Sequence, residues 1–393
     1  MPTRKNSLNS AWKFIVLVGV VSLFSDMTYE GARSISGPFL GMLQASAVVV
    51  GVVAGLGEFI GYGLRLVSGY LTDRVGKYWP TSFVGYAFNL LAVPLLALAW
   101  RWEVAACLLV TERLGRAIRT PARDAMLSHA VTQVGRGWGF GFHEAMDQVG
   151  AVLGPILVAG IIYFKGGYRE GFAVLLIPAL LALAVLSVCA RLYPEPQHLE
   201  ETRPHLAAGG FRHPYWLYMV AAGLLAAGYA DFPLIAYHLS KTGIAAPGWI
   251  PLLYALAMGV DAVAALALGR IFDRLGPGIL AAVPFLSVFF APLVFLGGFH
   301  WALAGMVLWG IGMGAQESII KAPLVEMIPK ERRATGYGLF YAGFGLFWLL
   351  GSTLMGFLYE ISLVYLVAFS MLTQLGAVPL LLWLGRSPER GEG

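Results

Sequence analysis

The residues of this sequence that could do chemistry are acids, histidines and arginines that interrupt otherwise hydrophobic stretches. Asp26, Glu30 and Arg33 follow one another at i, i+4 and i+7, which places them on one face of a helix. His143 and Asp147 share a face in the same way. A carboxylate in weakly polar surroundings can bind and release a proton, and a neighbouring arginine favours its charged form. These spacings therefore predict a site that exchanges protons.

Ionisable side chains at the centre of a bilayer are costly, at about 2.5–3.5 kcal/mol each on insertion scales. They must face each other or a watery cavity. Asp26, Glu30 and Asp147 are the predicted proton carriers. The residues predicted to line a substrate cavity are Arg33, Arg113, His143, Glu144, Asp231, His238, Asp261, Glu317 and Lys321.

Composition indicates a protein that crosses the membrane many times. Of the 393 residues, 58% are apolar and only 12% are charged, whereas soluble domains carry about 25% charged residues. The mean hydropathy of +0.72 agrees. Cys107 and Cys189 form neither a disulfide framework nor a metal-binding spacing. The polar stretch before the first apolar run has no cleavage site, so we read it as a cytoplasmic tail.

The apolar runs predict an all-α membrane protein with twelve transmembrane helices, since about 20 apolar residues cross a bilayer. The predicted spans are 14–40, 47–70, 79–99, 104–126, 138–164, 171–190, 214–240, 247–269, 279–298, 302–325, 336–359 and 362–385.

The basic residues predict the orientation of these spans. With the N-terminus inside, 18 Lys and Arg lie on the inner side, four lie outside and five lie at membrane depth. Cytoplasmic loops carry the excess of basic residues. We therefore expect a multi-pass protein of the plasma membrane (the inner membrane in a bacterium) with both termini in the cytoplasm.

The chain divides into two similar halves. The stretch "GYLTDRVG" at 69–76 returns as "GRIFDRLG" at 269–276, and each follows the second span of its half. The polar stretch 191–213 reads as a cytoplasmic linker. The predicted organisation is an N-terminal six-helix half (1–190), the linker (191–213) and a C-terminal six-helix half (214–393).

The stretch "GYLTDRVGK" resembles the loop signature of the major facilitator superfamily, which lies between spans two and three in that family. Tyr78 departs from the pattern, where a second basic residue is usual. The resemblance implies two pseudo-symmetric halves, a binding site between them and alternating access. It also implies a cytoplasmic gating motif in which Asp73 and Arg74 latch the closed halves. The matching residues of that motif are Gly69, Asp73, Arg74, Gly76 and Lys77.

The fifth span resembles the antiporter signature of proton-driven drug exporters, G-x-x-x-G-P-x-x-G-G. Gly150, Gly154 and Pro155 match it, whereas Val158 and Ala159 replace its final glycine pair. Small residues four apart let a neighbouring helix approach closely, and a proline bends the helix that carries it. The resemblance implies export by exchange, and ordinary close packing is the alternative interpretation.

In the fourth span, Arg113 is nearest to the arginine that such exporters carry within an R-x-x-x-G pattern, although Gly115 stands two residues too close. By analogy with multidrug/proton antiporters, we expect Asp26 to contact Arg113 across the cavity. The expected mechanism is competition, in which substrate and proton favour different charge states of one site.

These observations predict a secondary active transporter, foremost a proton-coupled antiporter that exports a small organic molecule or drug. A proton symporter or uniporter that imports a polar metabolite is the main alternative, followed by a divalent-metal exporter and a non-transporting sensor. The sequence has no catalytic motif of an enzyme and no nucleotide-binding loop. We expect a monomer without cofactor or resident metal, whose partners are the substrate, protons and the lipid bilayer, and not nucleic acid.

Overall fold

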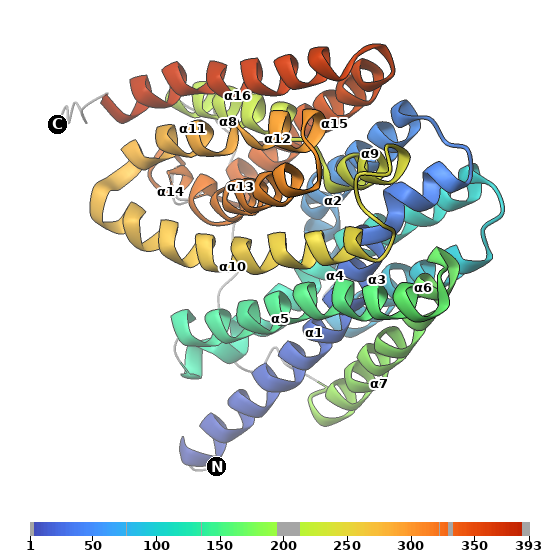
Figure 1. Ribbon diagram of the computed structural model, residues 1–393. Coiled ribbons are helices and arrows are strands. Elements are labelled where there is room, and N and C mark those ends of the chain that lie inside the picture. The colour runs from blue at the N-terminus through green and yellow to red at the C-terminus, as the bar shows by residue number, and fades with distance from the viewer. Residues whose placement is uncertain are drawn as a thin grey trace. The chain divides into compact units, whose positions relative to one another are not determined.

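The computed structural model describes residues 4–75, 77–134, 136–194, 213–321, 323–328 and 333–386, and secondary structure in these ranges is entirely helical (Figure 1). Ten helices in this part of the chain are long and apolar enough to cross a membrane. The other two predicted spans, 104–126 and 302–325, coincide with helices α4 (Trp102–Val134) and α13 (Phe299–Ser318). The all-helical fold predicted from the sequence is confirmed.

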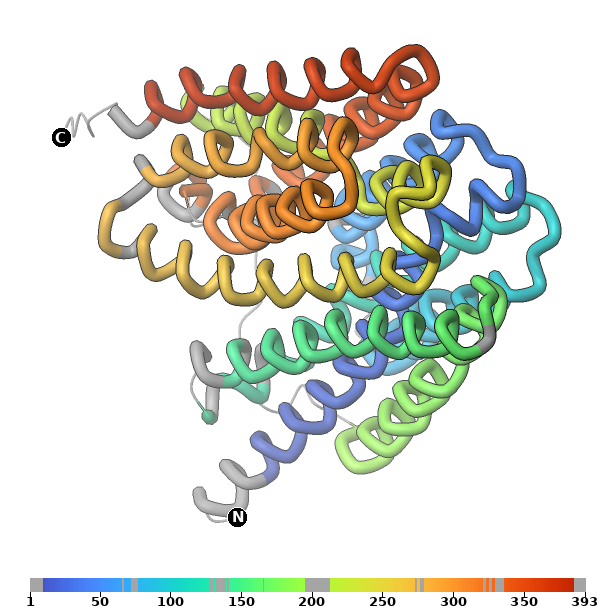
Figure 2. Tube along the Cα trace, in the orientation of Figure 1, coloured from blue at the N-terminus to red at the C-terminus, as the bar shows by residue number. Residues whose placement is uncertain are grey.

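The chain forms two compact units. The first comprises residues 1–44, 64–203 and 246–255. In it, α1 packs against α4, α5 and α7, and α3 packs against α4, and the trace in Figure 2 follows α1 as one long helix. The helices of this unit are α1 (Arg4–Met42), the later part of α2 (Ala47–Val75), α3 (Tyr78–Leu95), η1 (Leu96–Leu98), α4, α5 (Arg136–Lys165), α6 (Tyr168–Val174) and α7 (Leu176–Leu192).

The second unit comprises residues 45–63, 204–245 and 256–393. Here α8 packs against α15 and α16, just as α1 packs against α5 and α7, so equivalent spans of the two halves make equivalent contacts. The helices are α8 (His213–Gly228), α9 (Phe232–Lys241), α10 (Trp249–Leu275), η3 (Gly276–Ala281), α11 (Ala282–Ser287), α12 (Phe290–Leu296), α13, η4 (Ile319–Lys321), α14 (Leu324–Met327), α15 (Arg333–Ile361) and α16 (Leu363–Arg386). The start of α10 belongs to the first unit and the start of α2 to the second.

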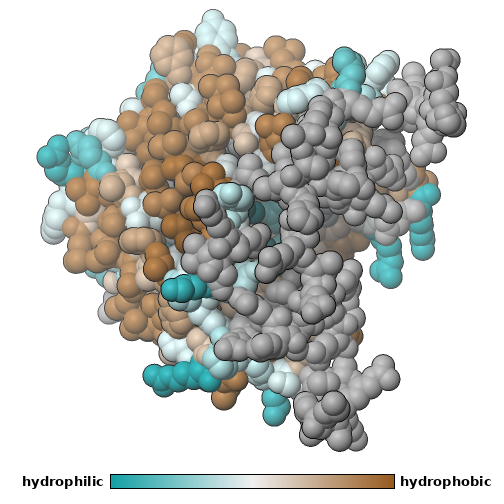
Figure 3. All heavy atoms as spheres, turned by 180° about the vertical axis from the view of Figure 1, so that it is seen from behind, coloured by the Kyte–Doolittle hydropathy of each residue, from teal (hydrophilic) through white to brown (hydrophobic). Residues whose placement is uncertain are grey.

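The exposed surface of the described residues is rich in hydrophobic side chains, as expected for contact with lipid (Figure 3). Val263 and Leu266 of α10 are 69% and 79% exposed, whereas Asp26 and Glu30 are each only 7% exposed. This arrangement is the reverse of a soluble protein, in which large apolar side chains are buried and charges face water. Hydrophobic side chains meet the lipid, and the charges are kept inside.

The predicted span 214–240 is broken between α8 and α9. Asp231 stands before α9 and its Oδ1 accepts a hydrogen bond of 3.0 Å from the Phe232 amide. Trp348 Nε1 donates to the other carboxylate oxygen at 3.3 Å. Pro233 is in the first turn of α9, where its missing amide proton costs no helical bond. Asp231 therefore has a structural task as a helix cap.

Several predicted features fall outside the described residues. Among them are the side chains of Asp73 and Arg74 and the whole of Gly76. Most of the 191–213 linker also lies outside, although α7 extends to Leu192. Gly69 is described, and a Cβ added to it would lie 3.5 Å from Pro121 of α4. Lys77 is exposed at the start of α3.

The glycines of the antiporter-like motif lie where α5 touches α1. A side chain on Gly150 would meet the carbonyl oxygen of Leu23 and come within 3.2 Å of the Asp26 Cβ atom. A side chain on Gly154 would meet the carbonyl oxygen of Met27. Pro155 beside it is buried. The motif therefore lets the two backbones approach closely at the turn of α1 that carries Asp26.

We expect Gly154→Ala to lower the thermal unfolding midpoint of the purified protein, because its methyl group would collide with the α1 backbone. Overpacking of this kind typically costs about 1–3 kcal/mol. Gly160→Ala is the matched control on the same helix, since a Cβ there meets nothing within 4 Å. Equal midpoints for the two variants would show that the contact between α1 and α5 is not tight.

Candidate functional site

Charged side chains of α1 and α4 face one another along the contact between these helices. On α4, four arginines recur at i, i+3, i+6 and i+10, which places them on one face. They contact α1 at Tyr29, Asp26 and Ser22, in that order. Residue numbers therefore rise along α4 as they fall along α1, and the two helices run in opposite directions. The arginines of this face are Arg113, Arg116, Arg119 and Arg123.

Asp26 is paired with Arg119. Its Oδ1 lies 3.6 Å from Arg119 Nη2, and the two residues are 7% and 1% exposed. The Arg119 guanidinium also lies over the ring of Tyr86 from α3, 4.6 Å from its centroid. The expected contact of Asp26 with Arg113 is therefore wrong in this structure, because the arginine beside Asp26 is six residues further along α4.

Arg113 instead belongs to a group around Tyr29. It donates to the Tyr29 hydroxyl, and its Nε lies 3.3 Å from Glu112 Oε2. Arg33 donates to the same hydroxyl at 3.3 Å. Arg116 lies over the Tyr29 ring, 4.2 Å from its centroid. One buried tyrosine thus contacts three guanidinium groups through its oxygen and its ring face, an arrangement that offsets part of the cost of burying cations.

Glu30 has different surroundings from Asp26, although it is one helical turn away. Its Oε2 accepts a hydrogen bond of 2.6 Å from the hydroxyl of Tyr254, at the start of α10. In the described part of the chain, no cationic nitrogen lies within 4.0 Å of its carboxylate. Of the two acids on this face, Asp26 is neutralised by an arginine and Glu30 is held by a tyrosine.

A second polar cluster joins α5 to α1 and α4. Asp147 Oδ2 lies 3.6 Å from His143 Nδ1 and 3.7 Å from Arg123 Nη1. Ser22 completes the cluster, because its hydroxyl is 2.8 Å from His143 Nε2 and accepts from Arg123 at 3.1 Å. The predicted common face of His143 and Asp147 is confirmed. Glu144 is exposed.

The predicted cavity residues of the second unit lie in separate surroundings. Asp231 caps α9, and His238 Nδ1 is 3.1 Å from the Tyr359 hydroxyl. Asp261 is buried, 1% exposed, where α10 passes Gly314 of α13. Glu317 is exposed, and the Lys321 side chain lies outside the described residues. Among the described residues no group of three or more His, Cys, Asp or Glu could hold a metal ion.

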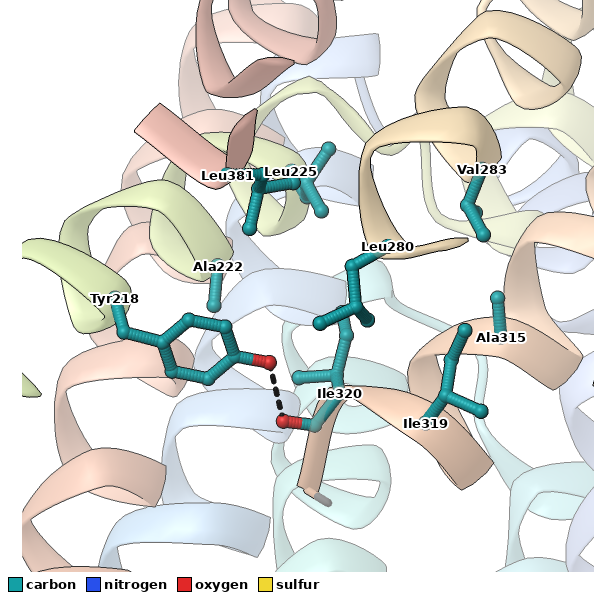
Figure 4. Close-up of a pocket in the computed structure, with 9 residues that line it drawn as sticks. All are labelled: Tyr218, Ala222, Leu225, Leu280, Val283, Ala315, Ile319, Ile320 and Leu381. Carbon is teal, nitrogen blue, oxygen red and sulfur yellow. Dashed lines mark hydrogen bonds between the residues drawn. The ribbon is translucent and has the colours of Figure 1, made fainter. Parts of the chain in front are cut away.

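A small pocket in the second unit has a different character (Figure 4). The only polar side chain drawn in the close-up is Tyr218, whose hydroxyl donates to the Ile320 carbonyl at 2.6 Å. The remaining lining is aliphatic: Ala222, Leu225, Leu280, Val283, Ala315, Ile319, Ile320 and Leu381. This lining carries no charged side chain, unlike the contacts between α1, α4 and α5 of the first unit.

Four residues of these contacts were missing from the predicted site. Three of them are arginines of α4. The signal that could have found them is the regular spacing of the arginines, which continues beyond the hydrophobic run. Tyr29 gave no such signal, since a tyrosine in an apolar helix is ordinary. The residues concerned are Tyr29, Arg116, Arg119 and Arg123.

Comparisons with known proteins agree with this architecture. The profile of the Major Facilitator Superfamily matches residues 18–322. An uncharacterized protein of Mycobacterium tuberculosis is 40% identical over 376 residues, which is 94% of this chain and 92% of the relative. An uncharacterized MFS-type transporter of Methanocaldococcus jannaschii is 25% identical over 367 residues, 89% of each chain.

Two further similarities are more limited. The multidrug resistance protein MdtH of Photorhabdus laumondii is 27% identical over 126 residues, 32% of this chain and 31% of that protein. The crystal structure of the nucleoside transporter NupG superposes with a TM-score of 0.76 at 11% identity, covering 93% of this chain and 99% of that one. At this identity the structural likeness concerns the fold alone. The profile match covers most of the sequence, and the chain therefore belongs to the major facilitator superfamily of membrane transporters.

Proposed function

We propose that this chain is a proton-coupled secondary transporter of a small organic molecule that works by alternating access. The observation that carries the proposal is the set of buried carboxylates and guanidiniums where α1 meets α4 and α5. Such groups are expensive inside a membrane protein and usually mark an ion or substrate pathway. Because the α5 backbone touches α1 at the turn of Asp26, movement of these helices would change the surroundings of that carboxylate.

The three predicted proton carriers take different parts in this proposal. Glu30 is the first choice, because only a tyrosine hydroxyl holds its carboxylate. Asp26 is the second, since it must separate from Arg119 before it binds a proton. Asp147 contacts both His143 and Arg123, so it serves to hold α5 in register with α4. At the predicted cytoplasmic ends, Asp73 and Arg74 remain the proposed latch.

The sign of the substrate's charge decides the direction of coupling at such a site. A cation competes with the proton for the carboxylate, so the two bind in alternation and are exchanged. An anion binds best when the carboxylate is protonated, so proton and anion bind together and are cotransported. The antiporter-like glycines and the partial similarity to MdtH support exchange and export. Cotransport is the second candidate. It is favoured by Arg116, which has no carboxylate within 4.0 Å among the described residues and could bind an anion.

We expect Glu30→Gln to reduce proton movement at least about tenfold in proteoliposomes of the purified protein, since the amide cannot carry a proton. A pH dye inside the vesicles would report proton movement when a gradient of a probe is imposed. Ethidium, a permanent cation, and naphthalene-1-sulfonate, a permanent anion, are suitable probes. Proton movement opposite to the probe indicates exchange, and movement with the probe indicates cotransport.

The matched control is Glu103→Gln, which removes an exposed glutamate in the first turn of α4. It should leave proton movement unchanged. Asp26→Asn tests the second carrier in the same assay. Full proton coupling in both Glu30→Gln and Asp26→Asn would refute the assignment of protons to α1.

The pair of Asp26 and Arg119 should behave as a unit in a double-mutant cycle of thermal stability. Removing one partner of a buried ion pair typically costs about 3–5 kcal/mol, because the other charge is left uncompensated. Asp26→Asn and Arg119→Gln should each destabilise the protein strongly. The double variant should recover part of the loss, and strictly additive changes would show that the two residues are not coupled.

A further inference from the structure

Arg116 is exceptional among the arginines of the contact between α1 and α4. In the described part of the chain, its guanidinium has neither a carboxylate within 4.0 Å nor a hydrogen-bond partner. It lies over the Tyr29 ring, with Asp26, Glu30 and Glu112 acting on its charge from further away. The residue is half-buried, so it is not fully hydrated either. A cation that is partly withdrawn from water without a direct ion pair is destabilising, and an oxyanion in contact with it would compensate that cost.

In the described part of the chain, no acid is paired with Arg116 at ion-pair distance. Asp26 faces Arg119, and Glu30 accepts from Tyr254. Glu112 faces Arg113 and also accepts 2.6 Å from the amide of Asn89. Asp147 faces Arg123 and His143. Three of these acids are thus paired with other cations, and Glu30, whose partner Tyr254 is neutral, is the acid that balances Arg116 from beyond 4.0 Å. When Glu30 is protonated, the positive charge of Arg116 is left for an anion.

The geometry of Arg116 also leaves its donors usable. Stacking on Tyr29 occupies the flat face of the guanidinium, with its central carbon 4.2 Å from the ring centroid. The five N–H donors of an arginine point outward in the plane of the group, away from such a stacked ring. A carboxylate, phosphate or sulfonate can accept two of them at once, which gives the strongest class of hydrogen bonds.

We propose that Arg116, oriented by Tyr29, binds the oxyanion group of an organic anion that is the substrate of this transporter. This inference rests on the transport function proposed above and gives its substrate class. A bound anion beside Glu30 and Asp26 favours the protonated form of these carboxyl groups. Proton and substrate then bind together, so the coupling is cotransport, in contrast to the exchange that the sequence predicted.

Isothermal titration calorimetry of the purified full-length protein tests the proposal without any gradient. Naphthalene-1-sulfonate serves as the anionic probe and 1-naphthyltrimethylammonium as its cationic counterpart, since the charges of both are independent of pH. We expect saturable binding of the sulfonate and a loss of at least about tenfold in affinity in Arg116→Gln. Arg116→Lys should lose less, because it keeps the charge but not the fork of donors.

The matched control is Arg191→Gln, which removes an exposed arginine at the end of α7 and should bind the sulfonate like the parent. Thermal unfolding midpoints verify that each variant is folded. No saturable sulfonate binding by the parent, equal affinity in Arg116→Gln, or a preference for the cationic probe would each overturn the proposal.

Repeating the titration in buffers of different ionisation enthalpy measures the protons taken up on binding. Uptake with the sulfonate, abolished in Glu30→Gln, supports an anion site linked to proton binding. Binding that depends on Arg116 but takes up no proton would support the anion site and contradict the proposed proton coupling. Proton coupling in vesicles without Arg116-dependent binding would overturn the anion site alone.

Discussion

The burial of charge between α1 and α4 is the constraint on which the first unit depends. A carboxylate and a guanidinium that lie 3.6 Å apart, as in Asp26 and Arg119, tolerate a hydrophobic setting because each neutralises the other. Small residues bring a third helix, α5, against the same part of α1. Gly150 and Gly154 bring α5 against α1, and the same helix supplies Asp147 to Arg123. Close packing and charge pairing thus support each other.

The two halves repeat their packing but not their chemistry. In the first unit, α1 carries acids and α4 carries arginines. In the second, the equivalent of α1 is broken into α8 and α9, and Asp231 is used to cap the break. Around it, the Tyr229 hydroxyl donates to the Trp309 carbonyl, and Trp309 Nε1 donates 2.9 Å to the carbonyl of Ala230. A helix interrupted in this way exposes backbone groups that side chains must satisfy. Around this break, the polar groups of the second half satisfy the backbone of an interrupted helix. Those of α1, α4 and α5 in the first half form ion pairs instead.

Much of this could be predicted from residue patterns, and the failures have physical causes. Helical periodicity, which is a local property, predicts that Asp26 and Glu30 share one face. It also predicts that His143 and Asp147 share a face. The partner of Asp26 depends on how two helices are aligned along their axes. The predicted fourth span, 104–126, already contains both Arg113 and Arg119, and hydropathy does not show which of them meets Asp26. Periodicity identifies a face, but it does not determine the residue that the face meets.

An arginine without a carboxylate at ion-pair distance is consistent with the demands of transport. A site in which every cation has a direct ion pair would gain little from an anionic substrate, and a half-buried cation without one would destabilise the empty protein. Stacking on a desolvated tyrosine returns about 2 kcal/mol, which lowers that cost without using the in-plane donors of Arg116. The empty site then stays folded while retaining an attraction for an oxyanion. Because part of the charge is already compensated by Tyr29, the anion is held moderately, as a carrier that must also release its substrate requires.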